Sequence, residues 1–125
     1  MKQELMDQLK KDFPTLNFTY CECGDGWYDL IRMAAEEMDH RSKQDHKQYQ
    51  FVQIKEKFGG LRIYCTSYNE YLFGYFRALE AISYITCEVT GKRGKLRTKK
   101  IVNGEFVNAW MQTLCDEEAA KAGYV

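Results

Sequence analysis

The amino-acid sequence predicts an α+β fold in which small antiparallel β-hairpins pack on two longer helices. Two segments repeat apolar residues at the spacing of an amphipathic helix, and several shorter segments alternate apolar and polar residues as half-buried strands do. In addition, Cys87 and Cys115 each begin a short motif of the kind found in metal sites. We therefore expect one domain over residues 1–125, with a helix–hairpin–helix core at 1–86 and a knuckle, a hairpin and a short helix at 87–125.

Length and composition are those of a small folded protein. At 125 residues and 45% hydrophobic content, the chain can bury a core. No stretch approaches the roughly 18 apolar residues of a membrane span, and residues 1–7 lack the apolar centre of a secretory signal. Five cysteines without such a signal indicate reduced thiols. We expect a cytoplasmic protein with no membrane partner.

The first forty residues predict a helix, a strand and a longer helix. Apolar residues recur at helical spacing as far as Phe13, and Pro14 ends that helix. Alternating residues then predict a strand over 16–20. Asp25 is expected to cap the longer helix. The inner stripe of this helix consists of Trp27, Leu30, Ile31, Ala34, Ala35 and Met38.

The middle of the chain predicts a loop followed by a hairpin. Residues 39–48 are polar, so we expect a surface loop. Residues 49–56 and 61–66 then read as two antiparallel strands. Gly59 and Gly60 lie between them and permit the positive φ angles of a tight turn.

The remaining segments predict a second long helix and a C-terminal hairpin. The stretch from Ser67 to Glu70 matches a capping box, which begins a helix expected to run to about Thr86. An Asn-Gly pair is the strongest short signal for a hairpin turn. The sequence therefore predicts strands at Lys95–Val102 and Glu105–Gln112 around Asn103-Gly104, and a short helix at 116–122 that stops at Gly123.

The two motifs at Cys87 and Cys115 resemble a zinc frame that has lost half of its ligands. A treble-clef zinc finger has the same order of knuckle, hairpin and helix, with donors expected at 87, 90, 115 and 118. Thr90 and Glu118 occupy two of these positions, and two thiolates with a hydroxyl and a carboxylate make a weak site. We therefore predict a degenerate treble clef with no cofactor, in which Thr90 closes the knuckle and Glu118 caps the helix. Bound zinc is the disfavoured alternative.

Two further cysteines, Cys21 and Cys23, are weaker metal candidates. In an extended segment their sulfur atoms lie on one side, and they could join Cys87 and Cys115 in a site of four thiolates. Burial as small hydrophobic residues is the expected role for each. The Cys-x-x-Cys spacing of redox enzymes is missing.

Charge is divided along the chain although the net charge is zero. Residues 1–40 carry four basic and nine acidic residues, and residues 41–125 carry fourteen and nine. A cluster without any acid is a candidate surface for phosphates or an acidic partner, or a solvated hairpin that uses charge to protect its edges. It consists of Lys92, Arg93, Lys95, Arg97, Lys99 and Lys100.

Aromatic residues suggest a second candidate surface. Tyr64, Tyr68 and Tyr71 surround one strand-to-helix junction near Arg62 and Arg77. Such residues stack on bases or anchor protein interfaces, although core packing with the hydroxyl directed outward is the default.

Four segments together resemble a family of short, largely uncharacterised proteins encoded by bacteriophages and prophages. The resemblance covers most of residues 18–122, and many members of the family look like complete fingers. It implies a phage context and action in the bacterial cytoplasm, but no reaction. The segments are Gly24–Ile31, Ile54–Tyr64, Thr86–Gly91 and Trp110–Asp116, and Lys55-Glu-Lys-Phe-Gly-Gly-Leu-Arg62 is the most specific part.

These features lead to two hypotheses about function. The first is a non-enzymatic phage-type protein that binds a host protein and antagonises host defence, for instance a CRISPR nuclease. The alternative is a nucleic-acid-binding module that uses the basic hairpin at 92–100. No catalytic arrangement is recognisable, because His40 and His46 lie in a polar stretch and the glycine motifs are too short for a nucleotide fingerprint. The sequence does not indicate an oligomeric state.

Overall fold

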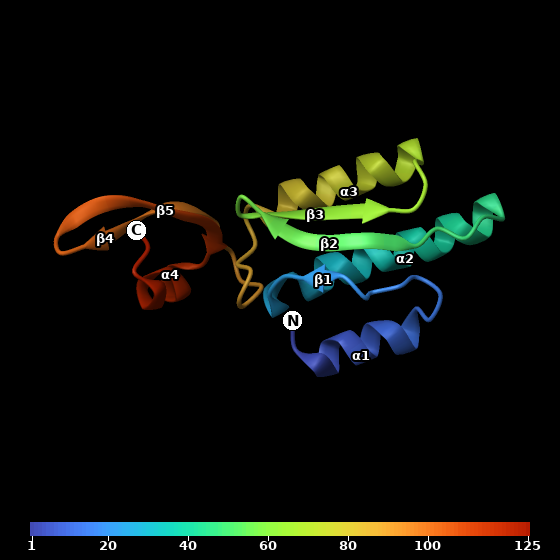
Figure 1. Cartoon of the computed structure of the whole chain (residues 1–125), viewed down its shortest axis with the longest axis horizontal. Helices are drawn as coiled ribbons and strands as arrows, with labels where there is room; N and C mark the ends of the chain where they lie inside the picture. The colour runs from blue at the N-terminus through green and yellow to red at the C-terminus, as the bar shows by residue number, and fades with distance from the viewer.

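Two separate β-sheets and four helices make up the computed structural model, which describes residues 1–125 (Figure 1). The α+β class is therefore confirmed. The helices are α1 (Gln3–Asp12), α2 (Tyr28–Asp45), α3 (Glu70–Ser83) and α4 (Asp116–Ala122), and a 3₁₀ turn at Asp25–Trp27 precedes α2. The strands are β1 (Cys21–Glu22), β2 (Phe51–Lys57), β3 (Gly60–Cys65), β4 (Lys95–Val102) and β5 (Glu105–Leu114).

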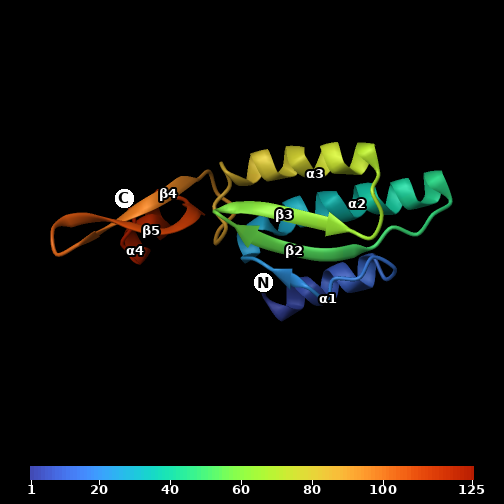
Figure 2. The same ribbon diagram turned by 45° about the horizontal axis from the view of Figure 1, so that its top comes forward.

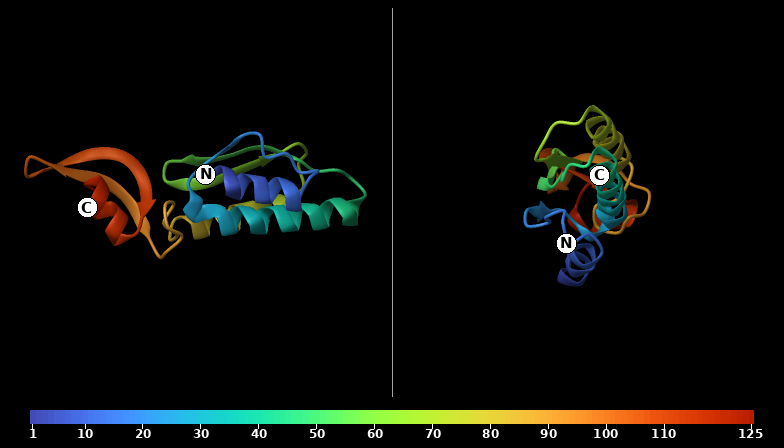
Figure 3. Two further views of the ribbon diagram at one scale, coloured as in Figure 1. Left: turned by 90° about the horizontal axis from the view of Figure 1, so that it is seen from below. Right: turned by 90° about the vertical axis from the view of Figure 1, so that its right-hand side faces the viewer.

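The first sheet has the strand order β1-β2-β3, with β1 parallel to β2 and β3 antiparallel to it. Helices α2 and α3 lie on one face of this sheet and leave the other face open (Figures 2 and 3). Helix α1 lies beside β1, whereas α3 extends beyond the edge formed by β3 (Figure 1). The helical layer is therefore wider than the sheet on the β3 side.

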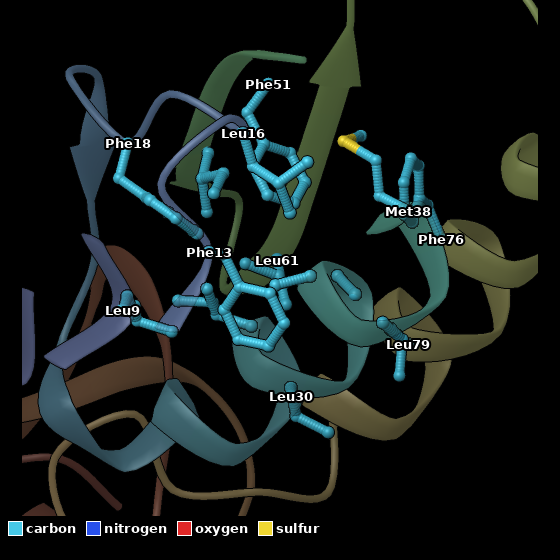
Figure 4. Packing of buried hydrophobic residues seen from close by; sticks show 14 of the residues in the cluster. Leu9, Phe13, Leu16, Phe18, Leu30, Met38, Phe51, Leu61, Phe76 and Leu79 are labelled. Atoms are coloured by element: carbon cyan, nitrogen blue, oxygen red, sulfur yellow. The ribbon is translucent and has the colours of Figure 1, made fainter. Parts of the chain in front are cut away.

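The main hydrophobic core lies between this sheet and its helices. Its 18 buried residues all come from positions 9 to 79 (Figure 4). All six residues of the predicted α2 stripe are buried, which confirms that prediction. Trp27 is completely buried, and its indole Nε1 donates a hydrogen bond to the carbonyl of Thr86 at 2.9 Å. A core residue thus fixes the position of Thr86, in the segment that connects α3 to the C-terminal part.

The loop predicted at residues 39–48 is wrong, because α2 continues to Asp45. Ion pairs one helical turn apart support this polar extension, such as Lys43 with Asp39 at 2.9 Å. Ser42 is buried there, and its hydroxyl accepts the backbone N–H of Tyr49. A polar segment can thus remain helical when tertiary contacts and side-chain pairs compensate for its missing apolar stripe.

The strand predicted at residues 16–20 is also wrong. Leu16 and Phe18 are buried, as their alternation suggested, but the ladder begins only at Cys21. Asn17 between them has a φ of 62°, which is incompatible with an extended strand. The segment instead touches β2 through single hydrogen bonds, including the one from the N–H of Phe51 to the Leu16 carbonyl.

Helix α3 differs from its prediction at both ends. Its N-cap is Asn69 rather than Ser67, because the Asn69 side chain accepts the N–H of Leu72 at 2.9 Å. The helix ends at Ser83, and single turns continue to Thr86. For α2 likewise, the expected cap at Asp25 makes no capping hydrogen bond; its carboxylate accepts the N–H of Lys2.

The C-terminal part has its own small core. Strands β4 and β5 form the predicted hairpin around Asn103-Gly104, and both turn residues have positive φ. Helix α4 packs on one face of this hairpin (Figure 3). The chain then returns to β4, where Gly123 accepts the N–H of Ile101. The second core cluster consists of Cys87, Leu114, Cys115, Ala119 and Tyr124.

One junction between the two parts is built on Gly24 and Gly26. The N–H of Gly26 donates to the backbone carbonyl of Glu88 at 2.7 Å, and the N–H of Gly24 donates to the Glu88 carboxylate at 2.9 Å. A Cβ on Gly26 would overlap the Cys87 carbonyl oxygen, and a Cβ on Gly24 would overlap that of Glu88. The Gly-Asp-Gly motif therefore permits backbone-to-backbone packing rather than nucleotide binding.

The second junction is built on the turn between β2 and β3. Phe58 and Gly59 adopt positive φ there. The hydroxyl of Thr113 donates to the Gly59 carbonyl at 2.7 Å, which ties β5 to the turn. A Cβ on Gly60 would overlap the ring of Tyr84. Gly59 thus supplies the turn, as predicted, whereas Gly60 is required for close packing.

We expect Gly26→Ala to destabilise the protein by about 1–3 kcal/mol, because the added methyl group has no space against the knuckle backbone. Urea denaturation measures this change. Gly74→Ala in α3 is the matched control, since a Cβ there meets nothing within 4 Å and alanine gains up to about 1 kcal/mol of helix propensity. Equal stabilities of the two variants would contradict this account of the junction.

Candidate binding surface

The knuckle from Cys87 to Gly91 is closed by hydrogen bonds. The N–H of Gly91 donates to the Cys87 carbonyl at 2.9 Å. The Thr90 hydroxyl donates to the Cys115 sulfur at 3.7 Å and accepts the N–H of Lys92. Thr90 therefore has the closing role that the sequence predicted for it. Glu118 does not, because α4 has no side-chain cap and the Glu118 carboxylate instead pairs with Lys121 at 3.2 Å.

The Cys87 sulfur is surrounded by hydrogen-bond donors. Burial raises the pKa of this thiol, but the Thr90 hydroxyl and the backbone N–H groups of Cys115, Thr90 and Val89 outweigh burial and lower the pKa below its usual value. The two cysteines at the predicted zinc positions are both buried and unbridged. Uncharged hydrogen-bond donors, the Thr90 hydroxyl and backbone N–H groups, therefore surround the sulfur atoms of Cys87 and Cys115.

The four-thiolate site considered for the cysteines is not assembled. No group of three or more His, Cys, Asp or Glu side chains lies close enough together to bind a metal ion. Cys21 and Cys23 are adjacent to each other instead. A hydrogen bond between their thiols lowers the pKa of Cys21 and raises the pKa of Cys23. Burial raises the pKa of Cys23 further.

Arg97 does not belong to a basic surface, which corrects the predicted cluster. It is buried, and its guanidinium donates two hydrogen bonds to the Leu114 carbonyl and one to Asp116 at 2.8 Å. This hydrogen bond and the positive charge hold the pKa of Asp116 below its usual value. Arg97 therefore fastens the base of the hairpin to the start of α4.

The other five basic residues differ in their surroundings. Lys92 and Glu117 form a weak exposed pair at 3.8 Å. Lys100 is half-buried, with its ammonium 4.7 Å from the centre of the Tyr124 ring. Arg93, Lys95 and Lys99 are exposed and form no ion pair. The exposed positive charge without an ion-pair partner therefore lies on three residues, Arg93, Lys95 and Lys99.

An exposed apolar face of the hairpin was missed by the sequence reasoning. Trp110 is 72% exposed and Phe106 is 69% exposed, and Ile101 pairs directly opposite Phe106. Trp110 lies in the irregular stretch of β5 between the paired residues Asn108 and Gln112, next to Ala109, which packs against the second core. We call Lys99, Ile101, Phe106 and Trp110 the hairpin surface. The sequence did contain a signal for this exposure: β5 has apolar residues at both odd and even positions, so some of them must lie on the face away from the core.

The β4–β5 hairpin, which carries the hairpin surface, projects away from the first sheet (Figure 1). Figure 3 shows that α4 lies under the hairpin on the side on which α2 lies under the first sheet. The uncovered faces of both sheets are therefore directed to the same side of the molecule. Tyr64 and Phe58 are exposed on the first sheet and its turn.

The predicted aromatic surface is divided. Tyr64 and Tyr68 line a cavity of about 330 Å³ between β3 and α3. Tyr71 is not part of it; the Arg41 guanidinium of α2 lies 4.5 Å from the centre of its ring. The tyrosines that are close in sequence thus belong to two different sides of α3.

Comparison with models of protein families, with curated proteins and with solved structures finds no match to this chain. None of the four helices has both the length and the apolar character that crossing a membrane requires.

We expect Arg97→Ala to destabilise the protein by about 1–3 kcal/mol, because it leaves the buried Leu114 carbonyl without a donor. Lys99→Ala is the control, since Lys99 is exposed and unpaired, and its effect should stay within about 0.5 kcal/mol. Urea denaturation of both variants measures the difference. If Arg97→Ala were as mild as Lys99→Ala, the guanidinium would not be fastening the hairpin.

The predicted degenerate treble clef can be tested by placing cysteines at its two unmatched ligand positions. We expect Thr90→Cys with Glu118→Cys to bind cobalt(II) with the absorption bands of tetrahedral thiolate coordination, because Thr90 already contacts Cys115 and position 118 lies one helical turn from it. Zinc should raise the Tm of this double variant more than that of Thr90→Cys alone. Absence of cobalt bands in the double variant would refute the prediction that positions 87, 90, 115 and 118 have the geometry of a treble-clef zinc site.

Proposed function

We propose that the protein is a non-enzymatic accessory protein that binds a protein of a bacterial host, and that the hairpin surface makes the contact. The exposure of Trp110 and Phe106 on a projecting arm carries this proposal. Large aromatic side chains of this kind are costly to leave in water and dominate the energetics of protein interfaces. Their position on an arm leaves them free to enter a cavity of a partner.

The hairpin is anchored at its base. Tyr124 and α4 pack there near Ala109 and Leu114, and Arg97 ties the base to Asp116. Residues 101–108 are exposed on both faces and are therefore accessible to a partner. The resemblance to phage proteins supports a host protein as partner, and antagonism of host defence in the bacterial cytoplasm, for example of a CRISPR nuclease, is the form of this function that we propose.

Nucleic acid is the second candidate partner. The specific observation in its favour is that Arg93, Lys95 and Lys99 are exposed without acidic partners, in the same part of the chain as the exposed Trp110. Cationic side chains next to aromatic rings suit single-stranded nucleic acids, whose bases stack on the rings. Arg97 takes no part in this alternative, because it is already committed to Asp116.

Affinity capture from host lysate tests the proposal, with and without nuclease treatment. We expect the wild-type protein to retain one host protein in both conditions, and Phe106→Ala with Trp110→Ala to lose at least about tenfold in affinity because hot-spot aromatic residues are removed. Tyr20→Ala is the control, since Tyr20 is 61% exposed but lies in the turn before β1, far from the hairpin in the sequence.

The same experiment separates the two candidates. Capture that disappears with nuclease, weakens steeply with salt and is abolished by Lys95→Glu with Lys99→Glu would favour nucleic acid over a host protein. Failure to retain any protein from several bacterial hosts would contradict the proposed function.

A further inference from the structure

A groove runs between β3 and α3 on the part of the molecule that is remote from the hairpin. Its cavity of about 330 Å³ is within the range of sites that hold small ligands or side chains. Ile63 and Cys65 of β3 form one side, and Phe73, Phe76 and Arg77 of α3 form the other. We call these residues the β3–α3 groove. Tyr68 lies at one end of it.

The backbone of β3 is unpaired along this groove. Strand β3 is at the edge of its sheet. Ile63 lies opposite Ile54 in the antiparallel ladder. The N–H of Ile54 donates to the Tyr20 carbonyl on the β1 side, so Ile54 and Ile63 form no hydrogen bond with each other. In such a pair both residues direct their N–H and C=O groups outward. The same alternation directs the N–H of Leu61 outward, where the Ser83 hydroxyl accepts it at 2.9 Å.

The backbone N–H and C=O groups of Cys65 are also directed outward, toward the groove. Cys65 is two residues beyond Ile63, and the neighbouring N–H of Thr66 is the group that reaches back to the Gln50 carbonyl of the strand segment before β2. The outward groups of Ile63 and Cys65 are therefore available to a further strand, whereas the N–H of Leu61 is already bonded to Ser83. An exposed edge of this kind is a template for strand addition.

Helix α3 supplies a floor for such a strand. It extends beyond β3, so the sheet is narrower than the helical layer beneath it (Figures 1 and 3). Phe73 of α3 is 51% exposed there, and Phe76 is nearly buried below it. A strand added to β3 would place alternate side chains on these two rings.

The charge of the groove favours a strand that carries an acidic side chain. The Glu80 carboxylate already pairs with Arg62 at 2.6 Å, and Arg77 is only 3.8 Å from it with a side chain that is 65% exposed. Two guanidinium groups thus share one carboxylate, which leaves the groove with a positive charge. Arg77 retains free donors for a second carboxylate.

We propose that the β3–α3 groove binds an extended segment of a partner protein by strand addition to Ile63 and Cys65, with an apolar side chain on Phe73 and an acidic side chain on Arg77. This site is separate from the hairpin surface. It does not depend on whether the hairpin binds a host protein or nucleic acid.

Random decapeptides displayed on a cell surface test the proposal by selection for binding to the full protein. We expect selected peptides to combine an acidic residue with apolar residues at alternate positions. A synthetic copy of a selected peptide should protect the amides of Ile63 and Cys65 from hydrogen exchange. Arg77→Glu should weaken its binding at least about tenfold by replacing attraction with repulsion, and Phe73→Ala should also weaken it.

Arg93→Glu is the matched control, because Arg93 is an exposed arginine on the other part of the molecule, and it should leave the affinity unchanged. Selected peptides that bind without protecting these two amides, or that bind Arg77→Glu equally well, would overturn the proposal. Protection of the same amides that rises with protein concentration in the absence of peptide would assign the edge to a second copy of the chain and overturn it likewise. Recovery of no binding peptide would do the same.

Discussion

Glu88 is central to the attachment of the C-terminal part to the first sheet, because its polar groups bond to two segments that are distant from it in the sequence. Its carbonyl and its carboxylate accept the amides of Gly26 and Gly24, and its own N–H donates to the Thr113 carbonyl. These bonds are possible only because two glycines allow backbones to approach without a Cβ between them. The C-terminal part is therefore attached through hydrogen bonds of the main chain and of a few polar side chains.

The small size of the second core makes this attachment important. Only five buried residues hold the knuckle, the hairpin and α4 together. Hydrogen bonds from Thr90 and Arg97, and the docking on Gly59 through Thr113, also connect these elements.

Elements with local signals could be predicted from the sequence, whereas those that depend on a distant partner could not. Pro14, the stripe on α2 and Asn103-Gly104 each act within a few residues, and all three features were found in the structure. The last turns of α2 were missed because Ser42 is stabilised by Tyr49 rather than by an apolar stripe. For the site, the closeness of Cys87, Thr90 and Cys115 followed from spacing. The burial of Arg97 and the exposure of Trp110 did not, since alternation along a strand does not reveal which face a later helix covers.

Glu88 also makes the attachment sensitive to acidity. Burial raises the pKa of its carboxyl above the ordinary 4.5. Such a group contributes most to stability when it is protonated in both states, and this contribution is lost as the pH rises through the elevated pKa. Asp116 at the base of the hairpin has the opposite sign, because its depressed pKa favours the folded state above the ordinary 3.8 and the benefit is lost below it. Lowering the pH through the raised pKa of Glu88 therefore favours the folded state, whereas acid strong enough to protonate Asp116 removes the stabilisation that comes from its bond to Arg97.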